Sequence, residues 1–186
     1  MNKKILLIVL VVVAGLIFMY GLSVYNGLVR ANEGADGQWA QVESQYQRRF
    51  DLIPNLVSSV QGAMKQEQVV FGVLADARTK YAGAVTVDEK ARAASQVESA
   101  LGRLIAVMEN YPELKSMEVV QALMAQLEGS ENRISVERMR FNEMIRSYNV
   151  MVKVFPKSVL ASMFGFSERN YFEAAEGSEV APKVNL

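Results

Sequence analysis

The chain has 186 residues, and its 20 Lys and Arg balance its 20 Asp and Glu, so the formal net charge is zero. This balance gives no general attraction to nucleic acid, and we exclude that class of partner. The chain contains no Cys and no His. Disulfides, thiol nucleophiles, zinc-thiolate sites and phosphotransfer through histidine are therefore excluded, and di-iron and His-ligated haem bundles are disfavoured. We expect no cofactor and no metal site.

The N-terminal segment 5–25 has no charged residue and is rich in Leu, Ile, Val, Phe and Met. A helix of about 20 apolar residues, rising about 1.5 Å per residue, spans a hydrocarbon core of about 30 Å. Lys3 and Lys4 precede the segment, so the positive-inside rule places residues 1–4 in the cytoplasm. The sequence predicts a single-pass anchor in the lipid bilayer, with the rest of the chain outside.

A cleaved signal peptide is the alternative interpretation of this segment. Its apolar core usually runs about 7 to 15 residues and ends at a small-x-small site. Here the run is longer, and Phe18, Met19 and Tyr20 stand where small residues would gather. Residues 29–31 (Val-Arg-Ala) form a conceivable late site. A mature protein beginning after Ala31 and released by a membrane wash would contradict the anchor.

The remaining chain reads as one helical domain, 26–172, followed by a flexible tail, 173–186. It has the common size of a domain, few prolines and no sustained strand-like alternation. We predict an all-α fold, in which the transmembrane helix precedes an antiparallel up-and-down bundle of three long helices and a short C-terminal helical segment. The tail is acidic, small and Gly/Ser-containing, which is typical of a solvated segment.

The first soluble helix is predicted from about residue 36 to 82, and it can continue directly from the anchor. Apolar and aromatic residues follow three-and-four spacing along it, from Trp39 to Tyr81. Pro54 interrupts the pattern, and Asp51 can cap a restarted helix, so we expect a kink or break near 50–54.

A turn at 83–87 leads to a second predicted helix, with Asp88 as its N-cap. This helix ends at Tyr111, because a residue before proline is pushed out of the α region. The third helix is predicted over about 115–155. Its heptad positions are Val120, Leu127, Ile134, Phe141, Tyr148 and Phe155. The phase is unchanged across Gly129–Ser130, so we expect no break there.

Glu131 and Arg138 interrupt the apolar seam of this third helix. A charge facing a core costs several kcal/mol unless it is paired, so partners are expected on the first helix. The interpretation is a polar network that fixes helix register; the alternative is a ligand or partner site. Comparing the folding and function of Arg138→Leu separates the two. The candidate residues are Arg48, Arg49, Asp51, Asn55, Arg78, Glu128, Glu131, Asn132, Arg138, Asn142 and Asn149.

A short apolar segment follows Pro156 and runs from Val159 to Phe166, flanked by lysines and Arg169. It is too short to span a bilayer, so it either plugs the open end of the bundle or touches lipid or a partner. No catalytic sequence motif is present, and paired carboxylates such as Glu128 and Glu131 are more simply solvated or salt-bridged. We expect no enzymatic function.

Several strings, in order, resemble the LemA family of bacterial membrane-anchored helical proteins. They are Trp39 with Val42, QYQRRFDLIPNLV (45–57), DAR (76–78), ENYPELK (109–115), QLEGSENRI (126–134), Arg138 with Asn142, SYN (147–149), FP (155–156), GF (165–166) and APKVNL (181–186). The resemblance implies a kinked, antiparallel helical bundle behind one anchor. The Gln-Tyr-Gln-Arg-Arg run and the C-terminal string look like the Gram-negative branch, which implies an inner-membrane anchor and a periplasmic bundle. The family supplies no established activity. Gln66–Glu67 stands where relatives often have His-Glu, so any family proposal that needs this histidine is in doubt here.

The sequence thus predicts a non-enzymatic, membrane-anchored interaction or scaffold module of the cell envelope, with an unidentified envelope protein as partner. One alternative is a small-ligand or lipid-binding bundle with a polar site around Arg49, Asp51, Glu131, Asn132 and Arg138. Self-association is a further hypothesis, because heptad seams left uncovered in one chain can be covered by another.

Overall fold

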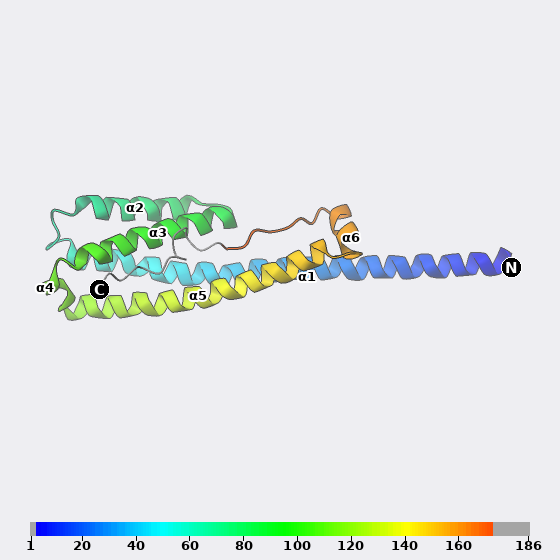
Figure 1. Cartoon of the computed structure of the whole chain (residues 1–186), viewed down its shortest axis with the longest axis horizontal. Coiled ribbons are helices and arrows are strands. Elements are labelled where there is room, and N and C mark those ends of the chain that lie inside the picture. Colours follow the sequence, from blue (N-terminus) through cyan, green and yellow to red (C-terminus); the bar gives the residue numbers. More distant parts are fainter. Residues whose placement is uncertain (1–2, 173–186) are drawn as a thin grey trace, which may run out of the picture. The chain divides into compact units, whose positions relative to one another are not determined.

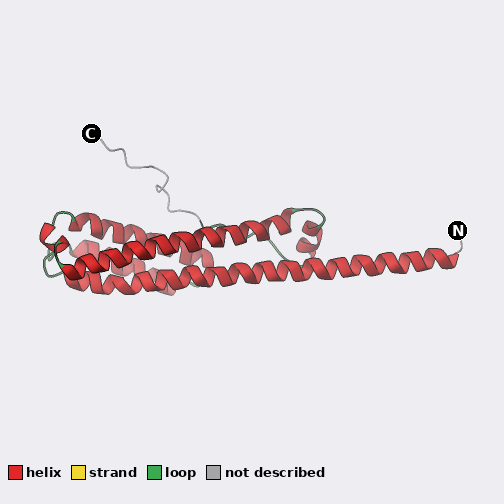
Figure 2. Cartoon of the chain, turned by 90° about the horizontal axis from the view of Figure 1, so that it is seen from below, coloured by secondary structure: helices red, strands yellow, loops and turns green. Residues whose placement is uncertain are grey.

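The computed structural model describes residues 3–172, and over this range the chain is helical with no strand. The predicted all-α fold is confirmed (Figures 1 and 2). The helices are α1 (Lys3–Val60), α2 (Gln68–Gly83), α3 (Val87–Met108), α4 (Pro112–Lys115), α5 (Glu118–Lys153) and α6 (Lys157–Met163). The predicted tail, including the APKVNL string, lies outside the described residues.

The chain divides into two compact units, each built from two stretches of sequence. The anchor unit consists of Met1–Gln38 and Arg140–Tyr171, and the bundle unit of Trp39–Met139 and Phe172–Leu186. α1 and α5 each contribute residues to both units, whereas α2, α3 and α4 belong to the bundle unit and α6 to the anchor unit.

α1 continues from the apolar N-terminal segment through Pro54 to Val60. The predicted continuity with the anchor is therefore confirmed. Of the kink or break predicted near 50–54, the break is wrong, because the helix continues through Pro54. Proline removes one backbone donor, and here the neighbouring Ile53 and Leu56, both almost fully buried, hold the helix on either side. Asp51 caps no restarted helix; its carboxylate accepts a hydrogen bond of 2.8 Å from Gln47 Nε2 within α1.

The interruption lies instead at residues 61–67, between α1 and α2. The backbone N–H of Met64 donates to the carbonyl of Val60 (3.0 Å), and the Met64 side chain is completely buried. The turn thus places the Met64 side chain in the core, which a straight continuation of α1 would not do. One predicted helix over 36–82 is therefore two helices.

Thr86, and not the predicted Asp88, is the N-cap of α3. Thr86 Oγ1 accepts from the backbone of Glu89 (3.2 Å), and Glu89 Oε2 accepts from the backbone of Thr86 (3.1 Å). This reciprocal capping box satisfies more donors than a single cap, and its backbone hydrogen bonds lower the pKa of Glu89. α3 ends at Met108, before Pro112 as predicted, and Pro112 then opens α4 at the position where its missing N–H costs nothing.

α5 runs without a break across Gly129 and Ser130, as the heptad phase predicts. Ser130 is buried, and its hydroxyl donates to the carbonyl of Leu127 at 2.6 Å, so the side chain needs no other partner. The heptad residues from Val120 to Tyr148 are all buried. Phe155 breaks the series because α5 ends at Lys153, and this ring is 78% exposed.

In the bundle unit, α2 and α3 lie beside the adjoining stretches of α1 and α5 (Figures 1 and 2), and buried side chains of these helices form its core. α2 and α3 are antiparallel neighbours joined by the short turn at 84–86. Aromatic rings fill one part of this core: the Phe50 and Tyr81 centroids are 4.7 Å apart, and Tyr46 and Trp39 each stack on Phe172.

The anchor unit has a smaller core around Val24, Leu28 and Ala161. Leu160 and Phe166 of the α6 region and Met151 and Val152 of α5 pack against it. The inner face of α6 therefore covers part of α1 and α5 within the anchor unit. Among residues 3–172, α1 is the helix that is long and apolar enough to cross a membrane; its apolar window has a mean hydropathy of 3.0 and is not buried by other parts of the protein.

Candidate functional site

An ion pair joins α1 to α5 inside the bundle unit. Arg49 is only 8% exposed, and its Nη1 contacts Glu131 Oε2. Burial lowers the pKa of Arg49, and the negative charge of Glu98 opposes that shift. Arg49 Nε is buried and has no hydrogen-bond partner among the described residues. The pair expected for Glu131 is thus present, but Arg49 still has an unused donor.

A second ionic cluster joins all three long helices of the bundle unit. Glu98 of α3 lies 3.7 Å from Arg138 Nη1 of α5 and accepts a 3.1 Å hydrogen bond from Tyr46 Oη of α1. The Arg138 guanidinium also lies over the Phe172 ring, 4.1 Å from its centroid, in a cation–π contact. Burial raises the pKa of Tyr46, and the charge of Glu98 raises it further.

Glu98 is the residue that the sequence analysis missed. The partner of Arg138 was expected on the first helix, and that expectation is wrong because the carboxylate comes from α3. The signal is present in the sequence: Glu98 stands four residues after Ala94 and three before Leu101, inside the apolar stripe of α3. A second missed pair joins Lys90 of α3 to Glu43 of α1.

The other predicted candidates of the bundle unit lie nearer its surface. Arg48 lines a hollow of about 210 Å³ between α1 and α5, together with Gln45, Leu52, Gln126, Ser130 and Arg133. Asp51, Asn55, Glu128 and Asn132 are exposed, and Arg78 is half-buried on α2. The predicted set is therefore not one site: the structure brings together Arg49 with Glu131, and places Arg138 in the cluster with Glu98.

Asn142 and Asn149 belong to the anchor unit, where Asn149 forms the centre of a polar clasp. Its Nδ2 donates to the Arg169 carbonyl (2.8 Å), and its Oδ1 accepts from the Arg169 backbone N–H (2.9 Å). The Arg169 side chain reaches α1, where it pairs with Asp36 (2.6 Å) and donates to Asn32 Oδ1 (3.0 Å).

Two further contacts complete the clasp, which we define as Asn32, Asp36, Tyr148, Asn149, Lys153 and residues 167–169. Tyr148 Oη donates to the Ser167 carbonyl (2.9 Å), and Lys153 pairs with Glu168 (2.7 Å). Burial raises the pKa of Tyr148, and the hydrogen bond to Glu168 raises the pKa of Lys153. The clasp fastens the chain after α6 to both α1 and α5.

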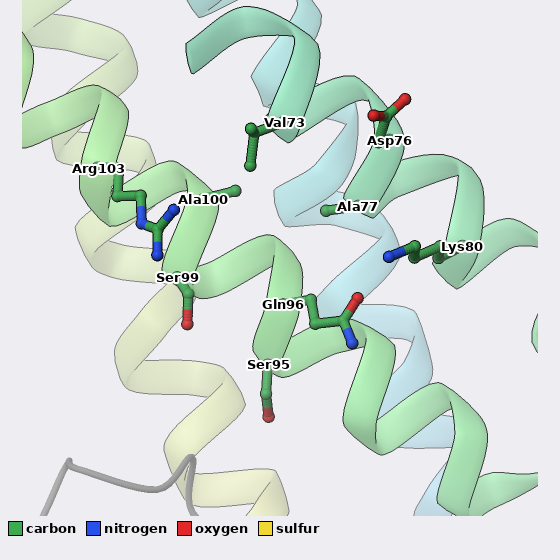
Figure 3. A pocket seen from close by; sticks show the side chains of 9 residues that line it. All are labelled: Val73, Asp76, Ala77, Lys80, Ser95, Gln96, Ser99, Ala100 and Arg103. Carbon is green, nitrogen blue, oxygen red and sulfur yellow. The ribbon is translucent and has the colours of Figure 1, made fainter. Parts of the chain in front are cut away.

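A groove of about 480 Å³ lies between α2 and α3 on the bundle unit (Figure 3). Val73 and Ala77 of α2 face Ala100 of α3 across it, and the small alanines let the two helices approach closely. Polar side chains form the rest of its lining: Asp76, Lys80, Ser95, Gln96, Ser99 and Arg103. An apolar floor with a polar rim is the usual composition of a contact surface.

The arrangement of these groups favours binding and register over acid–base chemistry. Within residues 3–172, no three or more His, Cys, Asp and Glu side chains gather as a metal site would need. Glu131, one of the paired carboxylates considered above, is engaged by Arg49. Glu67, beside the position that carries glutamine in place of histidine, lies 3.5 Å from Tyr111 Oη and accepts its hydrogen bond.

Comparison with known proteins agrees with this architecture. The LemA family model matches residues 38–186. Two magnetosome proteins of Paramagnetospirillum magneticum, MamQ 1 and MamQ 2, are each 27% identical over 175 residues, which cover 80% of this chain and 64% of the relative. MamQ of Magnetospirillum gryphiswaldense is 27% identical over 189 residues, covering 86% and 70%. The chain thus spans a little under two thirds of the first two relatives. It belongs to the LemA family.

Proposed function

We propose that this protein is a membrane-tethered interaction module of the cell envelope, without enzymatic activity. Residues 5–25 hold it in the inner membrane, with residues 1–4 in the cytoplasm and the bundle unit in the periplasm. The bundle unit offers its α2–α3 groove to an envelope protein. The observation that carries the proposal is the apolar stretch of α1, unburied within the protein, which continues as one helix into a charge-paired bundle.

The ionic contacts of the bundle unit support a binding role over a catalytic one. Arg138 and Glu98 each have an 18% exposed side chain and contact each other, while Tyr46 donates to Glu98. A charged side chain that is paired with residues on other helices fixes the register between those helices. The same pairing makes the charged group less available for proton transfer. The relatives are named for a cell structure, the magnetosome, and not for a reaction.

The α2–α3 groove is the favoured contact surface because it combines apolar and polar groups on rigid helices. Val69 of α2 is 77% exposed and extends the apolar character of the α2 surface beyond Val73. Lys80 and Arg103 give the rim two cations against the single carboxylate of Asp76. We therefore expect the partner to bring apolar side chains with a surplus of negative charge.

Site-specific photocrosslinking in cells tests this proposal. The crosslinking amino acid is placed at Gln96, in the groove, and at Glu128, an exposed control position on α5. We expect a defined envelope protein from position 96, lost when Ser99→Arg, at an exposed residue of the lining, fills the groove, and no such product from position 128. Mass spectrometry identifies the product, and crosslinks between two copies would reveal self-association. Recovery of only abundant, unrelated proteins from both positions contradicts the proposal.

A second candidate function is the binding of a small anionic ligand between α1 and α5. One observation favours it: the hollow between α1 and α5 is lined by two guanidinium groups, those of Arg48 and Arg133. A phosphate or carboxylate is the group that guanidinium donors bind best.

Thermal unfolding with inorganic phosphate and with small carboxylates tests this second function. A ligand that binds the folded state raises the melting temperature, and the stabilisation grows with the logarithm of one plus the ligand concentration over the dissociation constant. We expect the rise to disappear in Arg48→Gln and Arg133→Gln and to persist in Arg92→Gln, an exposed arginine outside the hollow. An equal shift in all variants would show a general salt effect and contradict the site.

A further inference from the structure

The part of the anchor unit that follows α5 exposes an unusual number of apolar side chains. Phe155 is 78% exposed, Met163 74%, Val159 52% and Phe164 46%. These residues lie on α6 and its flanks, whose other face is packed: Ala161 is completely buried against Val24 and Leu28. Water is an unfavourable neighbour for such a surface.

The position of α6 along α1 indicates what this surface meets. Leu160 and Phe164 line an apolar groove together with Ile17, Phe18, Gly21, Leu22 and Tyr25 of α1. The ring of Phe164 packs edge-on against Tyr25, with centroids 5.0 Å apart. In the anchor unit, α6 therefore lies beside the C-terminal part of the apolar segment 5–25.

We propose that α6 and its flanking residues 154–166 are immersed in the bilayer leaflet that holds the C-terminal part of segment 5–25, and that the groove between α1 and α6 holds a phospholipid acyl chain. This inference rests on the membrane tether of the proposed function. If residues 5–25 span the bilayer, the stretch from Ile17 to Tyr25 covers about 12 Å of depth at about 1.5 Å per residue. Whatever packs against that stretch lies at the same depth.

The backbone around α6 suits an apolar medium, which cannot supply hydrogen bonds. At its start, the Ser158 N–H donates to the Val154 carbonyl (3.0 Å). At its end, Gly165 adopts a positive φ of 77°, and Phe166 N–H donates to the Ala161 carbonyl (2.9 Å) while Gly165 N–H donates to Ser162 (3.2 Å). This Schellman motif satisfies carbonyls that would otherwise be left free.

One charge of the segment also fits the edge of a leaflet. Lys157 begins α6 and is exposed, whereas Lys153 at the end of α5 is paired with Glu168. A lysine carries a long apolar stem and can place its ammonium group among lipid phosphates while the stem stays in the acyl region. Residues 157–163 make a helix far too short to cross the bilayer, so any contact of this helix with the membrane is confined to one leaflet.

Single-cysteine spin labelling of the full chain tests the inference, because the native chain contains no Cys. Phe155→Cys and Met163→Cys carry the label in the segment. Val69→Cys, at a side chain 77% exposed on α2, is the matched control, and Leu10→Cys, 66% exposed in the apolar segment, reports the tether itself. The protein is placed in nanodiscs of phosphatidylcholine and phosphatidylglycerol, and accessibility is measured to oxygen and to a water-soluble nickel chelate.

We expect labels at 155 and 163 to resemble the label at 10: open to oxygen and several-fold less accessible to the nickel chelate than the label at 69. Acyl chains brominated at defined depths should quench a fluorophore at 163 and not one at 69. Nickel accessibility at 155 and 163 equal to that at 69 would overturn the inference while leaving the tether intact. Protection from both reagents would point to a second copy as the cover, which also overturns it. A water-accessible label at 10 would defeat the tether itself.

Discussion

The bundle unit and the anchor unit share α1 and α5 but are stabilised by different means. The bundle unit buries large rings and aliphatic side chains, with ion pairs such as Arg49–Glu131 set among them. The anchor unit has a small core around Val24, Leu28 and Ala161, and polar contacts at the clasp hold its returning segment. One helix can therefore pack into a protein core along one part of its length and expose apolar side chains along another part.

The difference changes the meaning of an exposed apolar residue. Val69 on α2 belongs to a surface that mixes apolar and polar side chains, whereas Leu10 and Phe155 belong to continuous apolar surfaces of the anchor unit. In our proposal lipid covers the second kind. Five predictions test how far the contrast between the units holds.

The largest effect is expected from Ile134→Ala in the bundle unit. Ile134 is completely buried, so truncation leaves a cavity and lowers the unfolding free energy by about 2–5 kcal/mol. Leu10→Ala, at a residue 66% exposed in the anchor unit, makes no cavity and should change that free energy little. Urea unfolding of the full chain in micelles, followed by helical circular dichroism, measures both. Equal losses would mean that the apolar segment is packed by protein after all.

Removing one member of the Arg49–Glu131 pair is expected to cost about 2 kcal/mol. Glu131→Leu leaves the buried Arg49 charge without its partner, although the Glu131 side chain is 46% exposed and solvent reduces the penalty. The double variant Arg49→Met/Glu131→Leu should recover most of the loss, because it leaves no unpaired charge. A double-mutant cycle on unfolding free energies gives the coupling, and additive effects would show that the pair is not coupled.

The clasp of the anchor unit should open locally when Asn149 is removed. Asn149→Ala deletes two hydrogen bonds to the Arg169 backbone, at a cost of about 1–3 kcal/mol for the partners left unpaired. Hydrogen exchange by mass spectrometry should accelerate over residues 160–171 and remain unchanged over α2 and α3. Asn132→Ala, at an exposed residue of the bundle unit, is the control. Faster exchange throughout would show that the clasp supports both units.

Two bundle-unit tyrosines should make stability fall at high pH. Burial raises the pKa values of Tyr46 and Tyr81 above the usual 10.0, so the folded state keeps protons that the unfolded chain releases. The unfolding free energy is therefore unaffected by these groups below about pH 10 and falls above it by about 1.4 kcal/mol per pH unit per tyrosine.

Replacing each tyrosine by phenylalanine separates this titration from hydrogen bonding. Tyr81 Oη is buried with no hydrogen-bond partner among the described residues, so Tyr81→Phe should be close to neutral at pH 7 and make the fall above pH 10 less steep. Tyr46→Phe also reduces the slope but costs about 1.5 kcal/mol at pH 7, because Glu98 loses a donor. Denaturation series at several pH values measure both, and an unchanged slope in Tyr81→Phe would contradict the assignment.

The smallest effect compares two glycines whose added Cβ would meet no atom within 4 Å. Gly165→Ala forces a side chain into a positive φ of 77° and should destabilise the anchor unit by about 1–2 kcal/mol. Gly102→Ala, within α3, should stabilise the bundle unit by about 0.5–1 kcal/mol, since alanine favours the helix. Differential scanning calorimetry measures whether each substitution raises or lowers the unfolding free energy. A neutral Gly165→Ala would mean that the turn after α6 is not held in this conformation.

The sequence predicts most of this fold, and the places where it fails have physical causes. The unchanged heptad phase correctly predicts that α5 continues across Gly129–Ser130, because burial of one helix face outweighs the turn propensity of these two residues. The same weight of burial keeps α1 intact at Pro54, where proline alone predicts a break. The α1–α2 turn at 61–67 depends on the burial of Met64 in the core, which no local sequence pattern predicts.

The candidate site was predictable in part for a similar reason. Glu131 stands out because it interrupts a long heptad series, and Arg49 is its partner. Glu98 interrupts a shorter stripe made largely of alanine, so its burial is harder to recognise. The clasp could not be predicted, because Asn149 and Arg169 meet through a segment with no periodicity of its own.

The contact between Arg169 and Asn32 also sets an order of events. The two residues are 137 positions apart, so this contact cannot form until nearly the whole described chain has been synthesised. α2 and α3, joined by a short turn, can pair much earlier, since a small loop costs less entropy to close than a large one. During biogenesis α2 and α3 can thus pair first. The clasp waits for Arg169, and the aromatic core of the bundle unit waits for Phe172, so both units are completed only by the last described residues.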